Sequence, residues 1–282
     1  MKIHNHLPLL LECLHRWKTC PSEKTFNLEY AEPLSKTTHH FFDDFYEVLI
    51  DLNWNDYREH ALKIDSIREE EQLKKNISLV ESLFGFSLSG EVFLLGTFLY
   101  MDGFARFDRG EHRVFLGVDE SHHDRNYLDI LTTHELTHVA RESRPEVWRG
   151  FGMEPKMKRS VYLENLPVIE HLLGEGFSCA VSEILIPGQE PWKYVYQTEK
   201  SLKNVYSRSL EIDQIIHHEI PKKDGDYGNF YGIQPTFSHY VWAWEWVKQL
   251  LKKYENKPHQ LISISSHEFI TDALEFSLKK IK

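Results

Sequence analysis

Apolar residues recur at helical spacing over most of the chain. They keep this period in residues 4–18, in a long stretch over 37–85 and in a strongly aromatic stretch over 237–254, while charged residues fill the opposite face. Such amphipathic stretches bury one side against a core, so each of them predicts helical structure. The chain is therefore predicted to be mainly helical.

A segment near the middle of the chain has a different pattern, which predicts strands. Residues 91–97 form a short apolar, β-branched run, and residues 103–108 and 112–118 form a pair of such runs. The intervening Asp108-Arg-Gly-Glu111 is typical of a hairpin turn. We therefore predict an α+β fold, mainly helical, in which a small antiparallel sheet leads directly into the next helix.

The change of pattern after Ser87 also predicts a division of the chain. We expect an N-terminal helical region over residues 1–87 and a second domain over residues 88–282 that includes a helical C-terminal part. At 282 residues the chain can bury a substantial core, either as one large domain or as two.

The sequence argues against nucleic-acid binding and against a membrane-spanning helix. The formal net charge is −10 and the chain has no long basic run, whereas nucleic-acid binding needs clustered Lys and Arg to neutralise phosphates. No apolar run reaches the roughly 18 residues of a membrane-spanning helix. The cysteines, Cys13, Cys20 and Cys179, are odd in number and lack the spacing of a disulfide framework, so we expect a reduced, cytoplasmic protein.

The strongest chemical signal lies on the helix predicted over residues 126–142, for which Asp124 suits the N-cap. The run His134-Glu-Leu-Thr-His138 places two histidines one helical turn apart on an apolar, buried face. Both imidazoles can bind one zinc ion, and Glu135 lies beside them to act on water. Because 17 residues are histidine, composition alone produces about 0.1 matches to this pattern, so its context has to decide.

A zinc hydrolase needs a third protein ligand and an open fourth position. No histidine follows His138 closely, which excludes the metzincin spacing. A second helix, predicted to begin near Asn165 and to reach Ile186, carries Glu175 among apolar residues, where a carboxylate is costly without a partner. The glycines on either side of Glu175 would let this helix approach the helix that carries the histidines.

Other residues of the second helix compete with Glu175. His171 shares a helix face with Glu175, so it is either an alternative ligand or a partner of the ligands. Glu170 lies about one turn upstream of Glu175, and Glu183 lies two turns downstream.

These motifs together resemble a gluzincin metallopeptidase. The histidine helix, the hairpin before it and the Gly-Glu-Gly-x-x-x-Ala helix after it are similar in particular to the bacterial predicted zinc-dependent protease families of the YjaZ-like kind. The resemblance covers residues 90–190 and part of 230–252, and it does not cover residues 1–85. It implies a zincin-like fold whose edge strand, beside the active-site helix, pairs with an extended substrate.

The resemblance also implies roles for residues. His134, His138 and Glu175 would bind Zn²⁺, and Glu135 would act as general base and then as general acid. A tyrosine or histidine from a C-terminal segment would stabilise the oxyanion. Tyr231, His239 and Tyr240 are the candidates, and Tyr231 is favoured because a neighbouring glycine permits close approach.

One position departs from the family pattern. Thermolysin-like enzymes have an aspartate one turn after the ligand glutamate, where it orients a histidine; here that position is Cys179. Some other group must then hold the imidazole, and Asp129 and Glu183 are the candidates.

We therefore expect a zinc-dependent hydrolase that cleaves peptide bonds in a peptide or protein substrate. One alternative is a zinc-binding but proteolytically inactive protein with a binding or regulatory role. The other is a structural α+β protein that binds no metal and in which the histidine pattern is coincidental.

Overall fold

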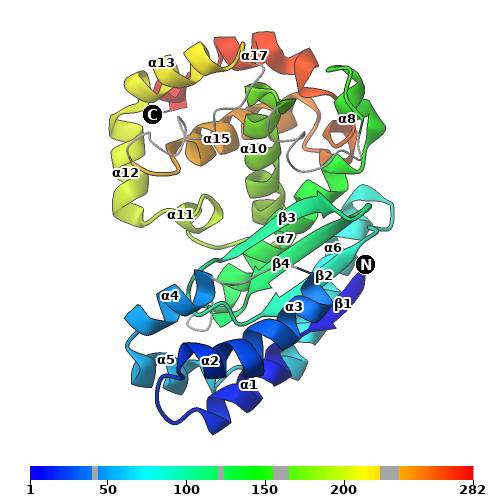
Figure 1. Cartoon of the computed structure of the whole chain (residues 1–282). Coiled ribbons are helices and arrows are strands. Elements are labelled where there is room, and N and C mark those ends of the chain that lie inside the picture. Colours follow the sequence, from blue (N-terminus) through cyan, green and yellow to red (C-terminus); the bar gives the residue numbers. More distant parts are fainter. Residues whose placement is uncertain (40–43, 120–123, 155–164, 223–234, 282) are drawn as a thin grey trace.

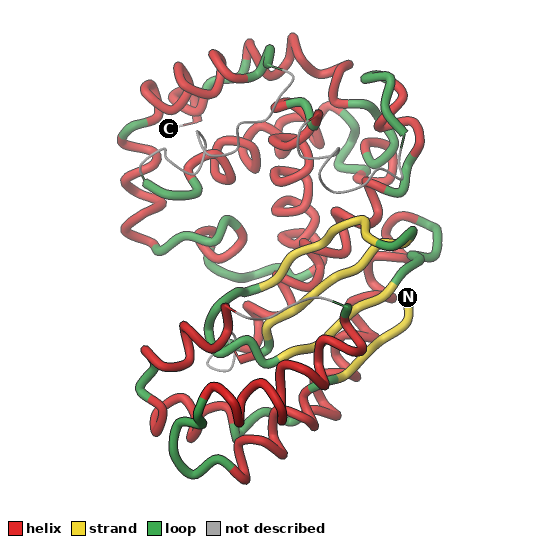
Figure 2. Tube along the Cα trace, viewed as in Figure 1, coloured by secondary structure: helices red, strands yellow, loops and turns green. Residues whose placement is uncertain are grey.

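A small sheet lies between two groups of helices (Figure 1, Figure 2). The structure is a computed structural model, and it describes residues 1–39, 44–119, 124–154, 165–222 and 235–281. The first group comprises β1 (Lys2–Asn5), α1 (Leu7–Arg16), α2 (Glu23–Phe26), a π-helical turn (Asn27–Ala31), α3 (Glu32–Thr38), α4 (Asp44–Asp51), α5 (Trp54–Ala61) and α6 (Ser66–Phe84). The central elements are β2 (Glu91–Leu95), β3 (Gly103–Asp108), β4 (Glu111–Gly117) and α7 (Arg125–Glu142). The remaining helices are α8 (Pro145–Arg149), α10 (Val168–Leu185), α11 (Pro191–Tyr194), α12 (Glu199–Ser207), α13 (Ser209–Glu219), α15 (Ser238–Lys253), α16 (Pro258–Leu261) and α17 (Ile270–Glu275), with short 3₁₀ turns at Ser266–Phe269 and Leu278–Ile281.

The predicted α+β class with mainly helical structure is confirmed. The long helical region predicted over 37–85 consists of separate helices, and its residues 40–43 lie outside the described residues. The helix predicted over 4–18 begins only at Leu7, because residues 2–5 form a strand instead. Four residues are too few to show a period of their own, so this strand depends on its neighbour in the sheet.

The sheet is mixed, which corrects the antiparallel sheet predicted from the sequence. Its strand order is β1-β2-β4-β3, and both β1–β2 and β2–β4 are parallel pairs. Only the hairpin pair β3–β4 is antiparallel. The hairpin turn lies where it was predicted, and Arg109 and Gly110 have positive φ values of 53° and 86°, as a two-residue type I′ turn requires.

Strand β3 forms one edge of the sheet, beside α7 (Figure 1). Asp108 and Glu111 are the pair that closes the two-residue turn, so the residues of β3 that bond to β4 alternate from Asp108. The backbone polar groups of Gly103, Ala105 and Phe107 therefore point away from β4, along the open edge.

Helix α7 lies at the centre of the structure, between α6 and the sheet on one side and α10 on the other. Helix α10 packs in turn along α15. Gly176 permits this second contact, because a Cβ there would lie 2.3 Å from the backbone oxygen of Ala243. This result corrects the expectation that both glycines of α10 face the histidine helix.

One hydrophobic core extends from Leu7 to Leu278, and a smaller cluster contains Val147, Trp148 and Leu166. Strand β1 pairs with β2 across the boundary predicted near residue 87, while the division into two domains stays a prediction. Within the described ranges, no helix is long and apolar enough to cross a membrane.

Candidate metal centre

Helix α7 presents His134, Glu135 and His138 from the buried centre of the protein. The side chain of Asp124 caps its N-terminus by accepting a hydrogen bond from the Asn126 amide at 3.1 Å, as predicted. Nearly the whole circumference of α7 is buried, and His134 and Glu135 are only 2% and 7% exposed. The histidines thus lie on a buried face, and their polar atoms need partners there.

Helix α10 supplies the third group. The helix begins at Val168, with Pro167 as its N-cap residue, rather than at the predicted Asn165. Glu175 lies in its buried middle, and a Cβ on the preceding Gly174 would lie 3.7 Å from the imidazole of His138. Gly174 therefore faces His138, but the distance between the helices there leaves room for a Cβ, unlike the close contact at Gly176.

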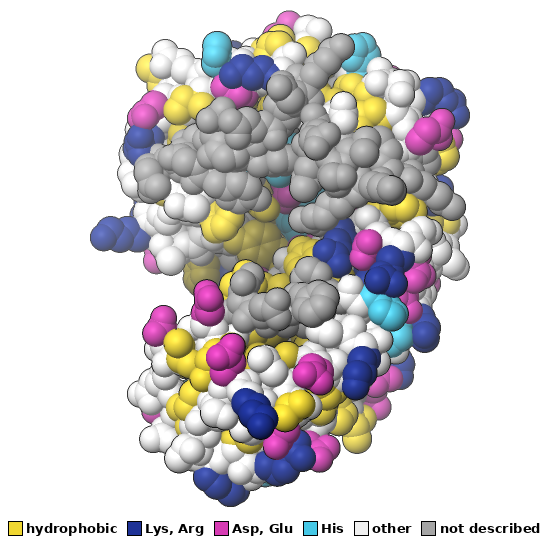
Figure 3. Space-filling model, viewed as in Figure 1, with side chains coloured by type: hydrophobic (Ala, Val, Ile, Leu, Met, Phe, Trp, Pro, Cys, Tyr) yellow, Lys and Arg dark blue, Asp and Glu magenta, His cyan; other side chains and the backbone are white. Residues whose placement is uncertain are grey.

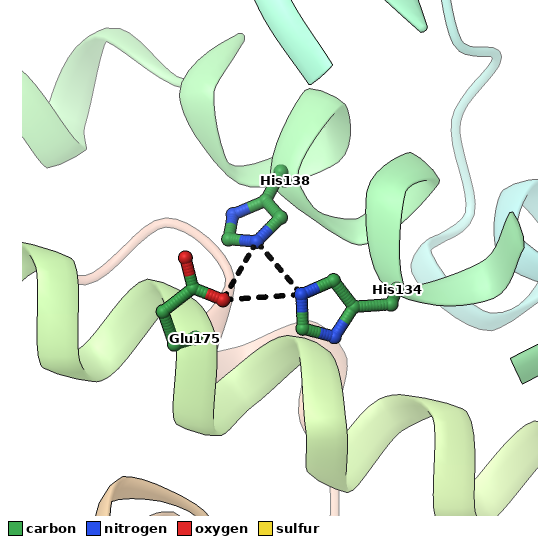
Figure 4. A group of neighbouring side chains, drawn as sticks. All are labelled: His134, His138 and Glu175. Atoms are coloured by element: carbon green, nitrogen blue, oxygen red, sulfur yellow. Dashed lines mark hydrogen bonds and ion pairs between the residues drawn. The ribbon is translucent and has the colours of Figure 1, made fainter. Parts of the chain in front are cut away.

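Three side-chain atoms of these two helices converge on one point (Figure 4). The Nε2 atom of His134 lies 3.1 Å from Oε2 of Glu175 and 3.1 Å from Nε2 of His138, and the third side of the triangle measures 3.3 Å. Among the described residues, this is the group of His, Cys, Asp and Glu side chains that could hold a metal ion. The three ligand atoms predicted from the sequence are thus brought together.

The triangle fits a tetrahedral metal site. With zinc–ligand bonds of about 2.0–2.1 Å, the ligand atoms of a tetrahedron lie roughly 3.3–3.4 Å apart. Two imidazole nitrogens and one carboxylate oxygen are also the donor set of a zinc site with an open fourth position. When both imidazoles are neutral, three lone pairs point at one buried position, an arrangement that needs a positive charge at its centre.

The three groups of the triangle shift one another's pKa values. Burial lowers the pKa of His138, but the Glu175 carboxylate and its hydrogen bond outweigh burial and raise the pKa to about 9. Burial raises the pKa of Glu175, and the charge of His138 with hydrogen bonds from both histidines brings it well below its usual value. Burial lowers the pKa of His134. A negative charge on Glu175 and a positive charge on His138 thus stabilise each other.

Glu135 lies next to this triangle on the side of the open strand edge. Its carboxylate accepts a hydrogen bond from the backbone amide of Ala105 in β3. Burial raises the pKa of Glu135 to about 7; the charge of His138 opposes this rise and that of Glu175 adds to it. Glu135 is therefore a carboxyl group whose proton is readily gained and lost, held between the strand edge and the triangle.

Cys179, one helical turn after Glu175, contacts the far nitrogen of His134. Its Sγ lies 3.8 Å from Nδ1 of His134, and its side chain is fully buried. Burial raises the pKa of the Cys179 thiol well above its usual value, so the thiol is neutral. The two carboxylates predicted for this role contact other groups, since Asp129 accepts a hydrogen bond from Asn76 and Glu183 accepts one from Trp244.

His171 and His239 lie on the opposite side of Glu175. The Nδ1 atom of His171 is 3.8 Å from Oε1 of Glu175, and its ring stacks on the ring of His239 at 5.6 Å between centroids. Burial lowers the pKa of His171 to about 4 and that of His239 to about 3, so both rings are neutral. His171 therefore faces the carboxylate oxygen that the triangle does not use.

The structure describes two of the three candidates for the oxyanion role. Tyr231, the favoured one, lies outside the described residues. His239 is fully buried, and Tyr240 places its ring 6.1 Å from that of His134. The structure adds Tyr196, whose ring is 5.2 Å from the ring of His134 and whose buried hydroxyl has no hydrogen-bond partner among the described residues.

Tyr196 was missed because it lies in a connection with no recognisable sequence motif. It follows α11 with a positive φ of 53°, an uncommon backbone conformation for a tyrosine. Burial and nearby groups, Cys179 first among them, raise the pKa of its hydroxyl well above the usual value, so it stays protonated. It is thus a hydrogen-bond donor beside His134.

A buried ion pair holds α7 against α10 close to the triangle. The guanidinium of Arg141 donates to both carboxylate oxygens of Glu170 at 2.7 and 2.8 Å, and it also donates to the backbone oxygen of Ile264 at 3.0 Å. Glu170, a competitor of Glu175 in the sequence, is therefore occupied by this ion pair. Such a bidentate pair specifies the spacing and rotation of the two helices.

The triangle opens into a cleft. A cavity of about 740 Å³ is lined by His134 and Glu135 at one end and by residues of β3, α11 and the start of α15 along its sides. Figure 3 shows a hollow lined with hydrophobic side chains between the two groups of helices. A substrate could therefore reach the open side of the site.

Comparison of the chain with protein-family models, curated proteins and solved structures finds no significant match. The family resemblance drawn from the sequence thus stays a prediction, and the function has to be argued from the site itself.

Proposed function

We propose that this protein is a zinc-dependent hydrolase that cleaves peptide bonds. The observation that carries the proposal is the triangle formed by His134, His138 and Glu175, whose sides of 3.1–3.3 Å match a tetrahedral zinc site. Glu135 and an accessible cleft adjoin this triangle. A purely structural zinc site would have four protein ligands, whereas three such ligands converge here among the described residues.

A zinc ion bound by these three residues supplies a Lewis acid that polarises a carbonyl group and lowers the pKa of water. Glu135 accepts the proton of the attacking water and then donates it to the leaving amine. The Ala105 amide holds the Glu135 carboxylate beside the strand edge during these transfers. The role of Glu135 follows from its position beside the three ligand atoms and from its place in the lining of the cleft.

Strand β3 favours a peptide over other substrates. Its outer edge carries the backbone groups of Gly103 and Phe107 beside α7, and an extended peptide can add to such an edge through main-chain hydrogen bonds. A peptide bound in this way would pass Glu135, because the carboxylate of Glu135 already bonds to the backbone of this strand. The substrate is therefore a peptide segment in extended conformation.

Tyr196 is the group that we assign to the oxyanion. Tyr196 lines the cleft with its ring against the ring of His134, and its buried, protonated hydroxyl lacks a partner among the described residues. A donor held in this way can bond the oxygen on which charge develops. Tyr231 and His239 stay predictions for the same role.

Metal analysis of the purified protein together with one variant tests the proposal. We expect about one zinc ion per chain, and we expect Glu135→Gln to keep the zinc while cleavage of a peptide library falls by about 10²–10⁴-fold. Glu146→Gln, which removes an exposed carboxylate from α8, the next helix along the chain, is the matched control and should cleave normally.

Two results would overturn the proposal. If the protein binds no zinc and added zinc leaves its melting temperature unchanged, the histidine pattern belongs to a structural protein. If zinc is bound but no library peptide is cleaved, the protein is a zinc-binding regulatory module rather than an enzyme.

A further inference from the structure

Four aromatic rings in contact with one another form a wall of the cleft beside His134. The rings of Tyr127 and Tyr196 meet edge to face at 6.0 Å, Tyr196 meets Tyr240 at 5.9 Å, and Tyr240 meets Phe237 at 5.5 Å. These four rings come from α7, from the connection after α11 and from the start of α15, and all four line the cavity. They form one continuous aromatic surface that begins at the candidate metal centre, and uncharged polar residues such as Gln197 and Thr236 complete the lining.

The base of this surface is also apolar. Leu131 lies one turn before His134 on α7, and Trp192 lies across the cavity on α11. At about 740 Å³ the cavity is within the range of pockets that hold small ligands or bulky side chains. A large side chain could therefore remove its apolar surface from water here, which favours its binding.

Both charged side chains at the rim of the cavity have partners within the protein. Asp102 accepts a hydrogen bond from the hydroxyl of Tyr127. The ammonium group of Lys193 bonds to the carboxylate of Asp124 at 2.6 Å. Apart from the site residues themselves, these are the charged groups among the described residues that line the cavity. Within this described lining, a charged ligand would therefore meet no uncompensated opposite charge outside the site residues.

We propose that this cavity is a specificity pocket for a large, uncharged, apolar side chain, preferably aromatic, of the peptide substrate. The pocket adjoins His134 and Glu135, so the side chain that it holds belongs to a residue next to the cleaved bond. Edge-to-face contact with the tyrosine rings favours an aromatic side chain beyond its area alone. The inference rests on the proposed peptidase function, which it deepens by naming the class of substrate.

Binding measurements test the pocket without requiring turnover. The Glu135→Gln protein is titrated calorimetrically with capped pentapeptides Ala-Ala-X-Ala-Ala in which X is Phe, Leu, Ala, Glu or Lys. We expect the Phe peptide to bind at least about tenfold more tightly than the Ala peptide, with Leu between them and with Glu and Lys weakest. Equal binding of the Phe and Ala peptides, or a preference for Lys or Glu, would overturn the inference.

Two conservative variants release the rim charges one at a time in the same Glu135→Gln background. Tyr127→Phe keeps the ring but frees the Asp102 carboxylate, so binding of the Lys peptide should improve about three- to tenfold. Asp124→Asn keeps an N-cap residue for α7 but frees Lys193, so binding of the Glu peptide should improve by a similar factor. If neither variant shifts the preference, the rim charges do not govern selection and this part of the inference fails.

The two levels of argument can fail separately. A preference for the Phe peptide without cleavage of any peptide by the unmodified protein would leave the pocket standing and remove the peptidase. Cleavage without a preference for apolar residues at the bond would keep the peptidase and remove the pocket.

Discussion

Two pairs of histidines flank Glu175, and they differ in almost every physical respect. His134 and His138 face Oε2 at 3.1 and 3.3 Å, beside an open cleft. His171 faces Oε1 at 3.8 Å and stacks on the fully buried His239. Carboxylates raise the pKa of His138 to about 9, whereas burial lowers the pKa of His171 to about 4.

The two pairs differ in the geometry that a metal ion requires. All four rings are near one carboxylate, so proximity to an acid does not decide. The nitrogens of the first pair and Oε2 of Glu175 all point at one position. Only such convergence matches the tetrahedral coordination of a metal ion. In the second pair the two rings stack on each other, so they fill space in the core and do not converge on a common point.

Removal of a ring from the converging pair should have the largest effect. Zinc sites with four ligands bind with about 10–16 kcal/mol, so each ligand is worth roughly 2.5–4 kcal/mol. We expect His138→Ala to weaken zinc binding by roughly 100–1,000-fold and to abolish cleavage. Competition with a zinc chelator measures the affinity, and an unchanged affinity would show that the triangle is not the metal site.

The next largest effect concerns the open side of the same pair. Tyr196→Phe removes a hydroxyl and keeps the ring that lies against His134, so zinc binding should be unchanged while kcat falls about 10²–10³-fold. Tyr240→Phe is the matched control and should retain most activity. A larger loss in the Tyr240 variant than in the Tyr196 variant would transfer the oxyanion role to Tyr240.

A smaller effect on zinc affinity is expected from the group that contacts the far nitrogen of His134. Cys179→Ala removes the sulfur 3.8 Å from Nδ1 of His134, and loss of such a supporting partner weakens metal binding by about tenfold. Cys13 is another buried free cysteine, and it lies on α1, far from Cys179 in the sequence. Cys13→Ala should therefore leave zinc binding unchanged. Equal affinities of the two variants would mean that Cys179 only fills space.

The smallest effect is expected in the stacked pair. His171→Phe keeps an aromatic ring against His239 and removes the nitrogen that faces Oε1. Because 3.8 Å is too long for a hydrogen bond between nitrogen and oxygen, His171 does not support the ligand as a bonded partner would, and zinc affinity should change by less than about threefold. A loss as large as that of His138→Ala would make His171 a ligand and remove the distinction between the pairs.

Local features of the fold were predictable from the sequence. Asp124 caps α7 as predicted, and the Arg109-Gly110 turn closes a hairpin, because both depend on a few neighbouring residues. The parallel pairing of β1 with β2 was not predictable, since it joins segments 89 residues apart, such as Lys2 with Glu91. Gly176 was misassigned for the same reason, because its partner Ala243 belongs to a helix far along the chain.

The candidate site divides in the same way. The spacing of His134 and His138 by itself determined two corners of the triangle, because an α-helix places residues four apart on one face. Only the tertiary structure decided that Glu175, rather than Glu170, reaches them, since Arg141 holds Glu170 and thereby positions α10. It alone also placed Tyr196 beside His134. Helical periodicity is local and can be read from a sequence, whereas convergence of three atoms within 3.3 Å depends on how separate helices pack.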